Sequence, residues 1–221
     1  MKKILNGVAL NFLKSPMNNT LTLSEISQET EETVDWLKTL KIKLDDTRIP
    51  EILKFAQLFA VEYDKYGKNI SEYTDIKKSG TAIDEAFTLN LIRQSFFKTK
   101  SDTVKEKIRA SILGTFHSVD ETSDTNKPRN YLYELEMAAY FIACGYKVTE
   151  DLNDVNYNYK NYRVNIQCKR PLQIEGVAKN FTKAVTQLIR KNRITTDPNS
   201  FGYVAISLEK IFTLDNGILV V

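Results

Sequence analysis

Ile166-Gln167-Cys168-Lys169-Arg170-Pro171 is the stretch of sequence that decides the expected fold and the candidate site. It closes a run in which apolar residues alternate with polar ones, and this period predicts a β-strand. Residues two apart in a strand project to the same face, so the Gln167 amide and the Lys169 ammonium should lie side by side. Asp154 begins an earlier strand-like run, and Glu134 lies upstream on an amphipathic helix. Together these side chains predict a site for a metal ion and a phosphate.

The segments around this stretch follow the order helix, three strands, helix, strand. The expected elements are a helix over 129–144 that ends at Gly145, strands over 146–149, 155–159 and 162–168, a helix over 177–191, and a strand over 201–208. Lys160 and Asn161 suit a hairpin turn between the second and third strands. Segments with helical spacing and segments with strand spacing thus follow one another in this stretch. This order predicts an α+β domain over residues 128–221.

Residues 22–116 carry apolar side chains at helical spacing and are predicted to form a series of helices. Thr22 and Glu25 fit a capping box at the start of the first helix, and Pro50 suits the first turn of the second. The following segment, residues 117–128, has almost no apolar content and ends in proline, which favours a linker. We therefore expect a helical N-terminal region over 1–127.

Composition sets broad limits on the class of protein. The chain has 221 residues, of which 42% are hydrophobic and 27% charged, as in soluble globular proteins. The net charge of +3 is too small to demand a nucleic-acid partner, so a basic surface would have to arise by local clustering. No apolar run reaches the length of a membrane-spanning helix, so no membrane partner is expected. Cys144 and Cys168 stand far apart, which favours packed thiols and a cytoplasmic, reducing location.

The predicted helix over 177–191 has two contrasting sides. Its expected apolar side consists of Val177, Phe181, Ala184, Val185 and Leu188. Its expected basic side, which spans about 80° of the helix circumference, consists of Lys179, Lys183, Gln187 and Arg190. A basic side of this kind is either a solvated surface or a contact for nucleic-acid phosphates, and the sequence leaves both readings open.

Hydrolysis of a phosphodiester requires a nucleophilic water, neutralisation of charge on the phosphate and help for the leaving oxygen. Mg²⁺ can supply all three, and it prefers hard oxygen ligands. Asp154 is the expected main ligand, joined by the side-chain oxygen of Gln167 and the backbone carbonyl of Cys168. Lys169 would orient the water and offset negative charge. Arg170, together with the basic helix side, would hold a nucleic-acid backbone.

These pieces resemble the PD-(D/E)XK nuclease superfamily, which has the restriction-endonuclease-like fold. The matching segments are RNYLYELEMAAYFIACGYKV, Asp154-Val155, IQCKRP, AVTQLIRK and GYVAIS. The resemblance implies an αβββαβ core and an active site made by a helix glutamate, a strand aspartate and an (E/Q)-x-K triplet. It thereby implies catalytic roles for Glu134, Asp154, Gln167 and Lys169, with Mg²⁺ or Mn²⁺ bound. Glu134 would reach the metal directly or through a water.

Three positions, 134, 153 and 167, decide how the resemblance maps onto this chain. Glu134 follows an aromatic residue, Tyr133, and fits the family pattern better than Glu136. Two residues along a helix correspond to a rotation of about 200°, so Glu134 and Glu136 cannot serve the same site. Asn153 stands where the family name has proline, and Gln167 replaces the more frequent glutamate. The missing negative charge at position 167 should weaken metal binding.

The expected function is that of a metal-dependent nuclease, acting on DNA rather than RNA, in restriction or phage defence. The N-terminal helices would position substrate, bind a partner protein or contact a second copy of the chain. Two alternatives stay open at this point. The domain could be an inactive restriction-like fold that binds nucleic acid or protein, or the function could lie in the helical half. A fragment of residues 128–221 that cuts nucleic acid would argue against the second alternative.

Overall fold

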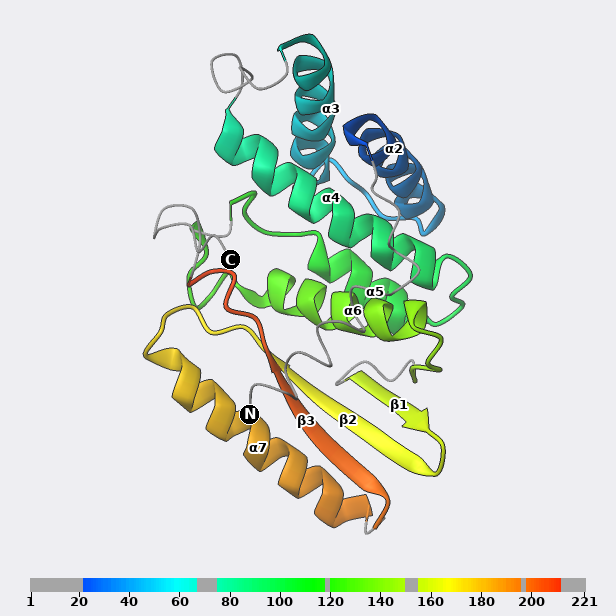
Figure 1. The fold of residues 1–221 in the computed structure, drawn as a ribbon, viewed down its shortest axis with the longest axis vertical. Helices are drawn as coiled ribbons and strands as arrows, with labels where there is room; N and C mark the ends of the chain where they lie inside the picture. The colour runs from blue at the N-terminus through cyan, green and yellow to red at the C-terminus, as the bar shows by residue number, and fades with distance from the viewer. Residues whose placement is uncertain (1–21, 67–74, 118–119, 150–154, 196–197, 212–221) are drawn as a thin grey trace.

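The computed structural model describes residues 22–66, 75–117, 120–149, 155–195 and 198–211, and these form an α+β fold (Figure 1). The helices are α2 (Leu23–Thr39), α3 (Ile49–Tyr66), α4 (Ile76–Phe96), α5 (Asp102–Ser111), α6 (Lys127–Ala143) and α7 (Gly176–Thr195). The strands are β1 (Val155–Tyr159), β2 (Tyr162–Lys169) and β3 (Ser200–Ile206). Helices α2 to α4 lie at one end and the sheet with α7 at the other, with α5 and α6 between them (Figure 1).

The N-terminal region begins its helices where the sequence predicts. The Glu25 N–H donates to Thr22 Oγ1 at 3.2 Å and the Thr22 N–H donates to Glu25 Oε2 at 2.7 Å, which completes the capping box of α2. Pro50 lies in the first turn of α3, where the backbone N–H has no intrahelical acceptor to lose. The predicted helical region is confirmed for the residues that the structure describes.

The end of α6 is fixed by a glycine in the left-handed region. Gly145 has φ of 84°, and its N–H donates to the Ile142 carbonyl at 2.8 Å. The Tyr146 N–H donates to the Phe141 carbonyl at 2.9 Å, so the two bonds form a Schellman motif. The rings of Phe141 and Tyr146 pack edge to face, 5.9 Å apart, which is the apolar contact typical of this motif. The predicted stop at Gly145 is confirmed.

The sheet is mixed and has the strand order β1-β2-β3 in the part of the chain that is described. Strands β1 and β2 are antiparallel and joined by a tight hairpin, in which Tyr159 pairs with Tyr162 and Lys160 has φ of 53°. Strands β2 and β3 are parallel and connected through α7. Because the register pairs Lys169 with Ile206, the C-terminal ends of β2 and β3 lie together.

The strand expected over residues 146–149 is not formed. Val148 makes only an isolated antiparallel bridge to Tyr157, supported by a 2.8 Å bond from the Thr149 N–H to the Asn156 carbonyl. The cause lies in the helix cap, because the Tyr146 N–H is already bonded to α6 and its ring packs on Tyr157. The described elements from α6 onward therefore follow the order αββαβ, with a single bridge in place of the first expected strand.

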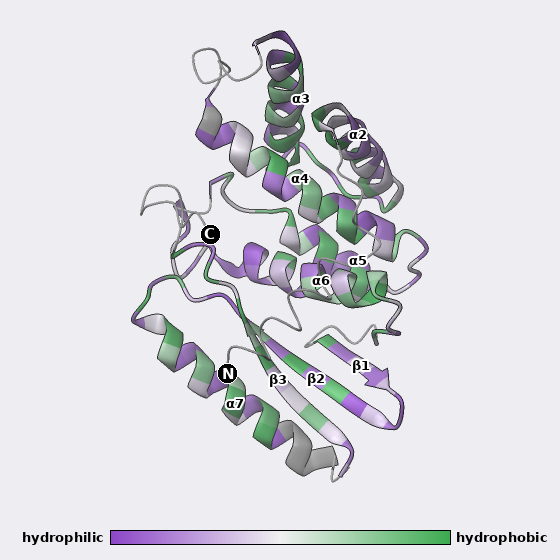
Figure 2. Ribbon diagram, in the orientation of Figure 1, coloured by the Kyte–Doolittle hydropathy of each residue, from purple (hydrophilic) through white to green (hydrophobic). Residues whose placement is uncertain are grey.

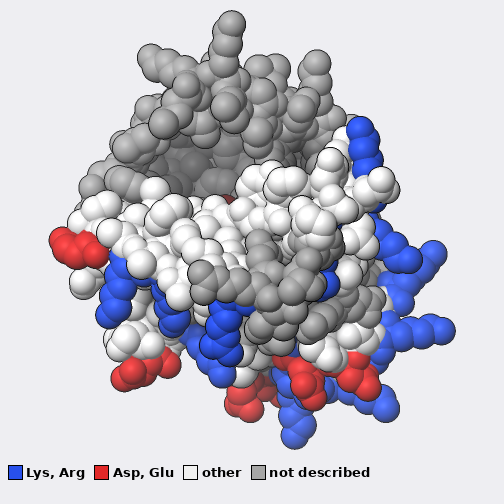
Figure 3. Space-filling view, turned by 90° about the horizontal axis from the view of Figure 1, so that it is seen from below, with Lys and Arg blue, Asp and Glu red and all other residues white. Residues whose placement is uncertain are grey.

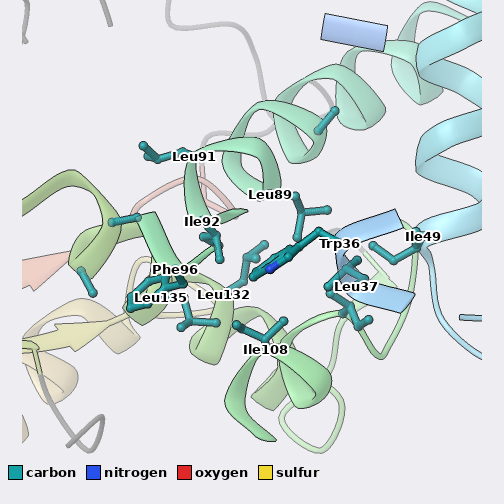
Figure 4. Packing of buried hydrophobic residues seen from close by; sticks show 14 of the residues in the cluster. Trp36, Leu37, Ile49, Leu89, Leu91, Ile92, Phe96, Ile108, Leu132 and Leu135 are labelled. Atoms are coloured by element: carbon teal, nitrogen blue, oxygen red, sulfur yellow. The ribbon is translucent and has the colours of Figure 1, made fainter. Parts of the chain in front are cut away.

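One apolar core runs across the boundary predicted at residue 127. Leu132 and Leu135 of α6 belong to the same cluster as Trp36 of α2 and Ile92 of α4. Figure 4 shows these side chains converging between the helices, with Trp36 at the centre of the view. The sheet residues Val164 and Ile166 join the cluster from the other side of α6. In Figure 2 apolar residues alternate with polar ones along these helices, as one-sided burial requires.

A chain of ion pairs, buried except for Glu209 at its end, also crosses this boundary. In spatial order its members are Arg48, Glu85, Arg129, Glu121, Arg170 and Glu209. Arg48 Nε lies 2.6 Å from Glu85 Oε2, and Arg129 Nε lies 2.6 Å from Glu121 Oε1. Each buried charge needs an oppositely charged or hydrogen-bonding partner, since desolvation costs several kcal/mol per ion. Glu121 is only 7% exposed, so the segment predicted as a linker is anchored to both regions.

Candidate active site

A cavity of about 960 Å³ lies where α6, the end of β2 and the first half of α7 meet. Seven of the residues predicted to form the site line it: Glu134, Cys168, Lys169, Arg170, Lys179, Lys183 and Gln187. Polar side chains from the segment before α6 also line it, namely Glu121, Thr122, Ser123 and Asn126, together with Asn130 of α6 and Lys210 after β3. Residues that are far apart in the sequence are thus brought to one cavity, because α6 and α7 both pack against β2.

Gln167 and Lys169 lie on one face of β2, as their spacing predicts. Lys169 Nζ donates to Gln167 Oε1 at 3.1 Å. This face is the one covered by α7, because Gly202 of β3, which pairs with Asn165 on that face, packs against Leu188. Lys169 lines the cavity, whereas Gln167 is 3% exposed and lies behind it. Asp154 falls within residues 150–154, which lie outside the described part of the chain.

Glu134 and Glu136 face different hollows, which agrees with the rotation between them on the helix. Glu134 lines the large cavity, and Glu136 lines a second one of about 260 Å³ together with Asp84 and Tyr133. Burial, followed by the negative charges of Asp84 and Glu209, raises the pKa of Glu136 to about 7. Of the two carboxylates, only Glu134 lines the cavity that Lys169 also lines.

Lys107 is a site residue that the sequence predictions missed. It lies on α5, is 8% exposed, and forms an ion pair with Glu134 Oε2. Its Nζ also lies 5.5 Å from the centroid of the Tyr131 ring. The sequence does contain a signal, because Lys107 falls on the stripe of α5 that carries Val104 and Ile108. A charged residue on a buried stripe calls for a partner on a neighbouring element.

Arg170 does not have the place expected for a contact to nucleic-acid phosphates. Its side chain is 2% exposed, with Nη1 2.5 Å from Glu121 Oε2 and Nε 3.2 Å from Glu209 Oε2. The physical reason is the alternation of an extended backbone, which turns Arg170 away from the face that carries Lys169. Arg170 touches the cavity wall, but its guanidinium joins the end of β2 to Glu121, and this burial does not suit the phosphate contact predicted from the sequence.

Helix α7 presents a narrower apolar side than predicted. Ala184 and Leu188 are buried against the sheet, and a Cβ at Gly202 would lie only 3.1 Å from Leu188 Cδ1. This close approach explains the glycine in β3. Phe181, predicted to lie on the apolar side, is 50% exposed.

The basic side of α7 divides in two. Lys179, Lys183 and Gln187 line the large cavity, whereas Arg190, further along the helix, is exposed and does not line it. Figure 3 views the molecule from the end that carries the sheet and α7, and it shows several Lys and Arg side chains standing out from this surface. Lysines one helical turn apart lie about 6 Å from each other. Lys179 and Lys183 therefore offer two successive cationic contacts along the cavity wall.

The described residues contain no group of three or more His, Cys, Asp or Glu side chains that could hold a metal ion. Two hard-oxygen donors occur among the predicted site residues: the Glu134 carboxylate, which lines the cavity, and the Gln167 amide oxygen, which lies behind it and accepts from Lys169 Nζ. These oxygens suit Mg²⁺ or Mn²⁺, which keep several waters, better than zinc, whose protein sites are built mainly from His and Cys ligands. The Cys168 thiol is buried, and Cys144, predicted to be packed, is exposed at the end of α6.

No protein-family model, curated protein or solved structure matches this chain. None of the helices in the described ranges is long and apolar enough to cross a membrane. The features of the molecule that bear on its function are the contacts of Glu134 with Lys107 and of Gln167 with Lys169, and the lysines that line the cavity.

Proposed function

We propose that this protein is a metal-dependent nuclease that hydrolyses phosphodiester bonds, with DNA as the preferred substrate. One observation carries the proposal: a helix carboxylate, Glu134, and a strand lysine, Lys169, line a single cavity together with Lys179 and Lys183 of α7. An acidic group and a lysine in the lining of one cavity suit a reaction centre, and further cations along its wall suit the flanking phosphates.

Each residue has a role that follows from its position. Glu134, Gln167 and the backbone carbonyl of Cys168 are the proposed donors for Mg²⁺, with Asp154 added from the sequence pattern. When bound, the ion would neutralise phosphate charge and lower the pKa of a water. Lys169, held by Gln167 at 3.1 Å, would orient the attacking water and stabilise the charge that develops on the phosphate.

The cavity wall suggests how the substrate is held. Lys179 and Lys183 would each contact a phosphate, and Gln187 would extend this row by one further turn. No aromatic residue lines the described wall, so bases would find no stacking partner there. Recognition through the backbone is the mode that this lining favours, and a role in restriction or phage defence is compatible with it.

A second candidate function is nucleic-acid binding without cutting. It is favoured by Gln167, which brings no negative charge to a metal ion, and by the lack of a three-acid cluster among the described residues. The two functions share the cationic wall and differ only at Glu134, Gln167 and Lys169. The N-terminal helices remain the proposed place for a partner protein or a second copy of the chain.

The test compares cleavage by wild type, Lys169→Ala and the control Lys147→Ala, which alters an exposed lysine outside the cavity. Each protein is incubated with supercoiled plasmid, linear duplex, single-stranded DNA and RNA, in Mg²⁺, Mn²⁺ or EDTA. We expect metal-dependent cutting of DNA that Lys169→Ala slows by about 10²–10³-fold, while Lys147→Ala cuts at the wild-type rate.

The outcomes separate the two candidate functions. Cutting by Lys169→Ala at the wild-type rate would refute the assignment of the site. Binding of DNA by the wild type without cutting in either metal would move the conclusion to the non-catalytic function. Cutting of RNA in preference to DNA would correct the substrate class and leave the site in place.

A further inference from the structure

Lys107 places a charge on the buried side of α5. Its neighbours on the stripe of α5, Val104 and Ile108, are 0% and 1% exposed, and Lys107 itself is 8% exposed. Burial of an ammonium group costs several kcal/mol unless partners compensate, and an apolar residue of similar size often serves stability equally well. The position of this lysine is thus better explained by what its charge contacts than by the packing of α5.

The contacts of Lys107 converge on α6. Its ammonium group pairs with Glu134 Oε2 and lies 5.5 Å from the ring centroid of Tyr131, one helical turn before Glu134. Lys127 Nζ lies 5.5 Å from the same ring centroid. The carboxylate and the ring restrict where the ammonium can lie, and the ammonium in turn restricts the carboxylate. Helices α5 and α6 are thereby joined at the wall of the large cavity.

We propose that Lys107 is a positioning residue for Glu134, an inference that rests on the proposed nuclease function. Its ion pair holds one carboxylate oxygen of Glu134 and so fixes the orientation in which this group faces the cavity. Because Lys107 belongs to α5, the helical N-terminal region supplies a part of the site. Groups that orient a metal ligand in this way typically change metal affinity or activity by about 10–100-fold when removed.

The experiment uses four variants of the full chain: Lys107→Met, Lys107→Arg, Glu134→Gln and the double variant Lys107→Met/Glu134→Gln. Three quantities are measured for each protein: the single-turnover cleavage rate, the Mg²⁺ concentration for half-maximal rate, and the rise in Tm on adding Mn²⁺. The Mn²⁺-linked rise in Tm reports metal binding without requiring turnover. All rates are measured well below the lowest Tm in the series, so that lost stability does not imitate lost positioning.

We expect Lys107→Met to need about 10–100-fold more Mg²⁺ or to cut that much more slowly, and to show a smaller Mn²⁺-linked rise in Tm. Lys107→Arg, which keeps the charge, should recover most of the activity. If Lys107 acts only through Glu134, the double variant should be no slower than Glu134→Gln alone. Should Lys107→Met fail to fold, Lys107→Gln takes its place in the same comparison.

The outcomes keep this inference separate from the nuclease proposal. Wild-type cutting and an unchanged Mg²⁺ requirement in Lys107→Met would overturn the positioning role alone. The positioning role would also be overturned if the fold-losses in rate of Lys107→Met and Glu134→Gln multiplied in the double variant, because this is the result expected of two independent effects. A wild-type protein that neither cuts nor gains Tm from Mn²⁺ would overturn the metal-dependent nuclease itself, and the positioning role with it.

Discussion

Arg170, at the end of β2, and Glu121, in the segment before α6, form a buried ion pair with 2.5 Å between Nη1 and Oε2. Both side chains are 2% exposed. The pair is one link in a chain of charges that reaches Arg48 and Glu85 in the helical region. Since Lys169 directly precedes Arg170, this chain fixes the end of the strand that carries the candidate catalytic lysine.

Loss of Arg170 should therefore lower stability rather than nucleic-acid affinity. We expect Arg170→Met to lower the free energy of unfolding by about 3 kcal/mol, because Glu121 and Glu209 lose a buried partner. Arg190→Met, at an exposed position of α7, is the matched control and should stay within about 0.5 kcal/mol of wild type. Urea denaturation of both variants measures the difference. A stable Arg170→Met protein with weakened DNA binding would restore the phosphate-contact role predicted from the sequence.

Stability should depend on pH through Glu136. Burial raises its pKa to about 7, whereas the ordinary value of 4.5 applies to the unfolded chain. Between these two values the folded protein keeps a proton that the unfolded chain releases, so this group makes stability fall as the pH rises from 4.5 to 7. Above pH 7 its contribution is constant.

Glu136→Gln should remove this fall, because glutamine stays neutral. The advantage of Glu136→Gln over wild type should grow by about 3 kcal/mol between pH 4.5 and 8. Urea denaturation at several pH values measures it, with Glu106→Gln, at an exposed position of α5, as the control. A constant difference between Glu136→Gln and wild type across this range would show that Glu136 titrates alike in both states.

The lysines of α7 should set the salt dependence of nucleic-acid binding. Lys179→Ala and Lys183→Ala should each reduce the slope of log K against log salt by about 0.9 for duplex DNA, or about 0.7 for a single strand. The affinity is measured by fluorescence anisotropy in EDTA, where a metal-dependent enzyme does not cut. Lys43→Ala, at an exposed position between α2 and α3, is the control and should leave the slope unchanged. Equal slopes for all three variants would place the nucleic acid elsewhere.

Residues 128–221 should not fold by themselves. Leu135, Ala138 and Ala139 of α6 are fully buried in the core that the N-terminal helices share. A fragment without those helices would expose this side of α6 and leave Arg129 without Glu85, its partner on α4. We expect no cooperative thermal transition by circular dichroism and poor dispersion of amide signals by NMR. A fragment that unfolds cooperatively and cuts DNA would instead support an independent domain at this boundary.

Local pattern was sufficient to predict much of the architecture. Thr22 with Glu25, Pro50, Gly145 and the Lys160-Asn161 turn each act within a few residues, and the structure has each of them where the sequence places it. The strand expected over 146–149 failed for a reason that is also local. The cap of α6 takes the Tyr146 N–H, which is then not available to a neighbouring strand. The alternation of apolar residues does not reveal that the helix cap and the strand compete for this group.

In the candidate site, too, some features follow from local spacing and others only from tertiary packing. Alternation within β2 was enough to place Gln167 beside Lys169, and helical rotation was enough to separate Glu134 from Glu136. The partners of Glu134 and Arg170 could not be read in this way. Lys107 and Glu121 lie on other elements, and only the packing of α5 against α6 and the path of the segment before α6 bring them near.

By itself, then, the sequence determined the helices, the hairpin and the pairing of Gln167 with Lys169, because turns, caps and periodic burial depend on neighbours along the chain. Tertiary structure alone decided that the two predicted regions share one core, that Arg170 is buried with Glu121, and that Lys107 reaches Glu134. Those outcomes depend on which charges meet once apolar faces have packed. Desolvation then forces each buried charge to take whatever partner the packing provides.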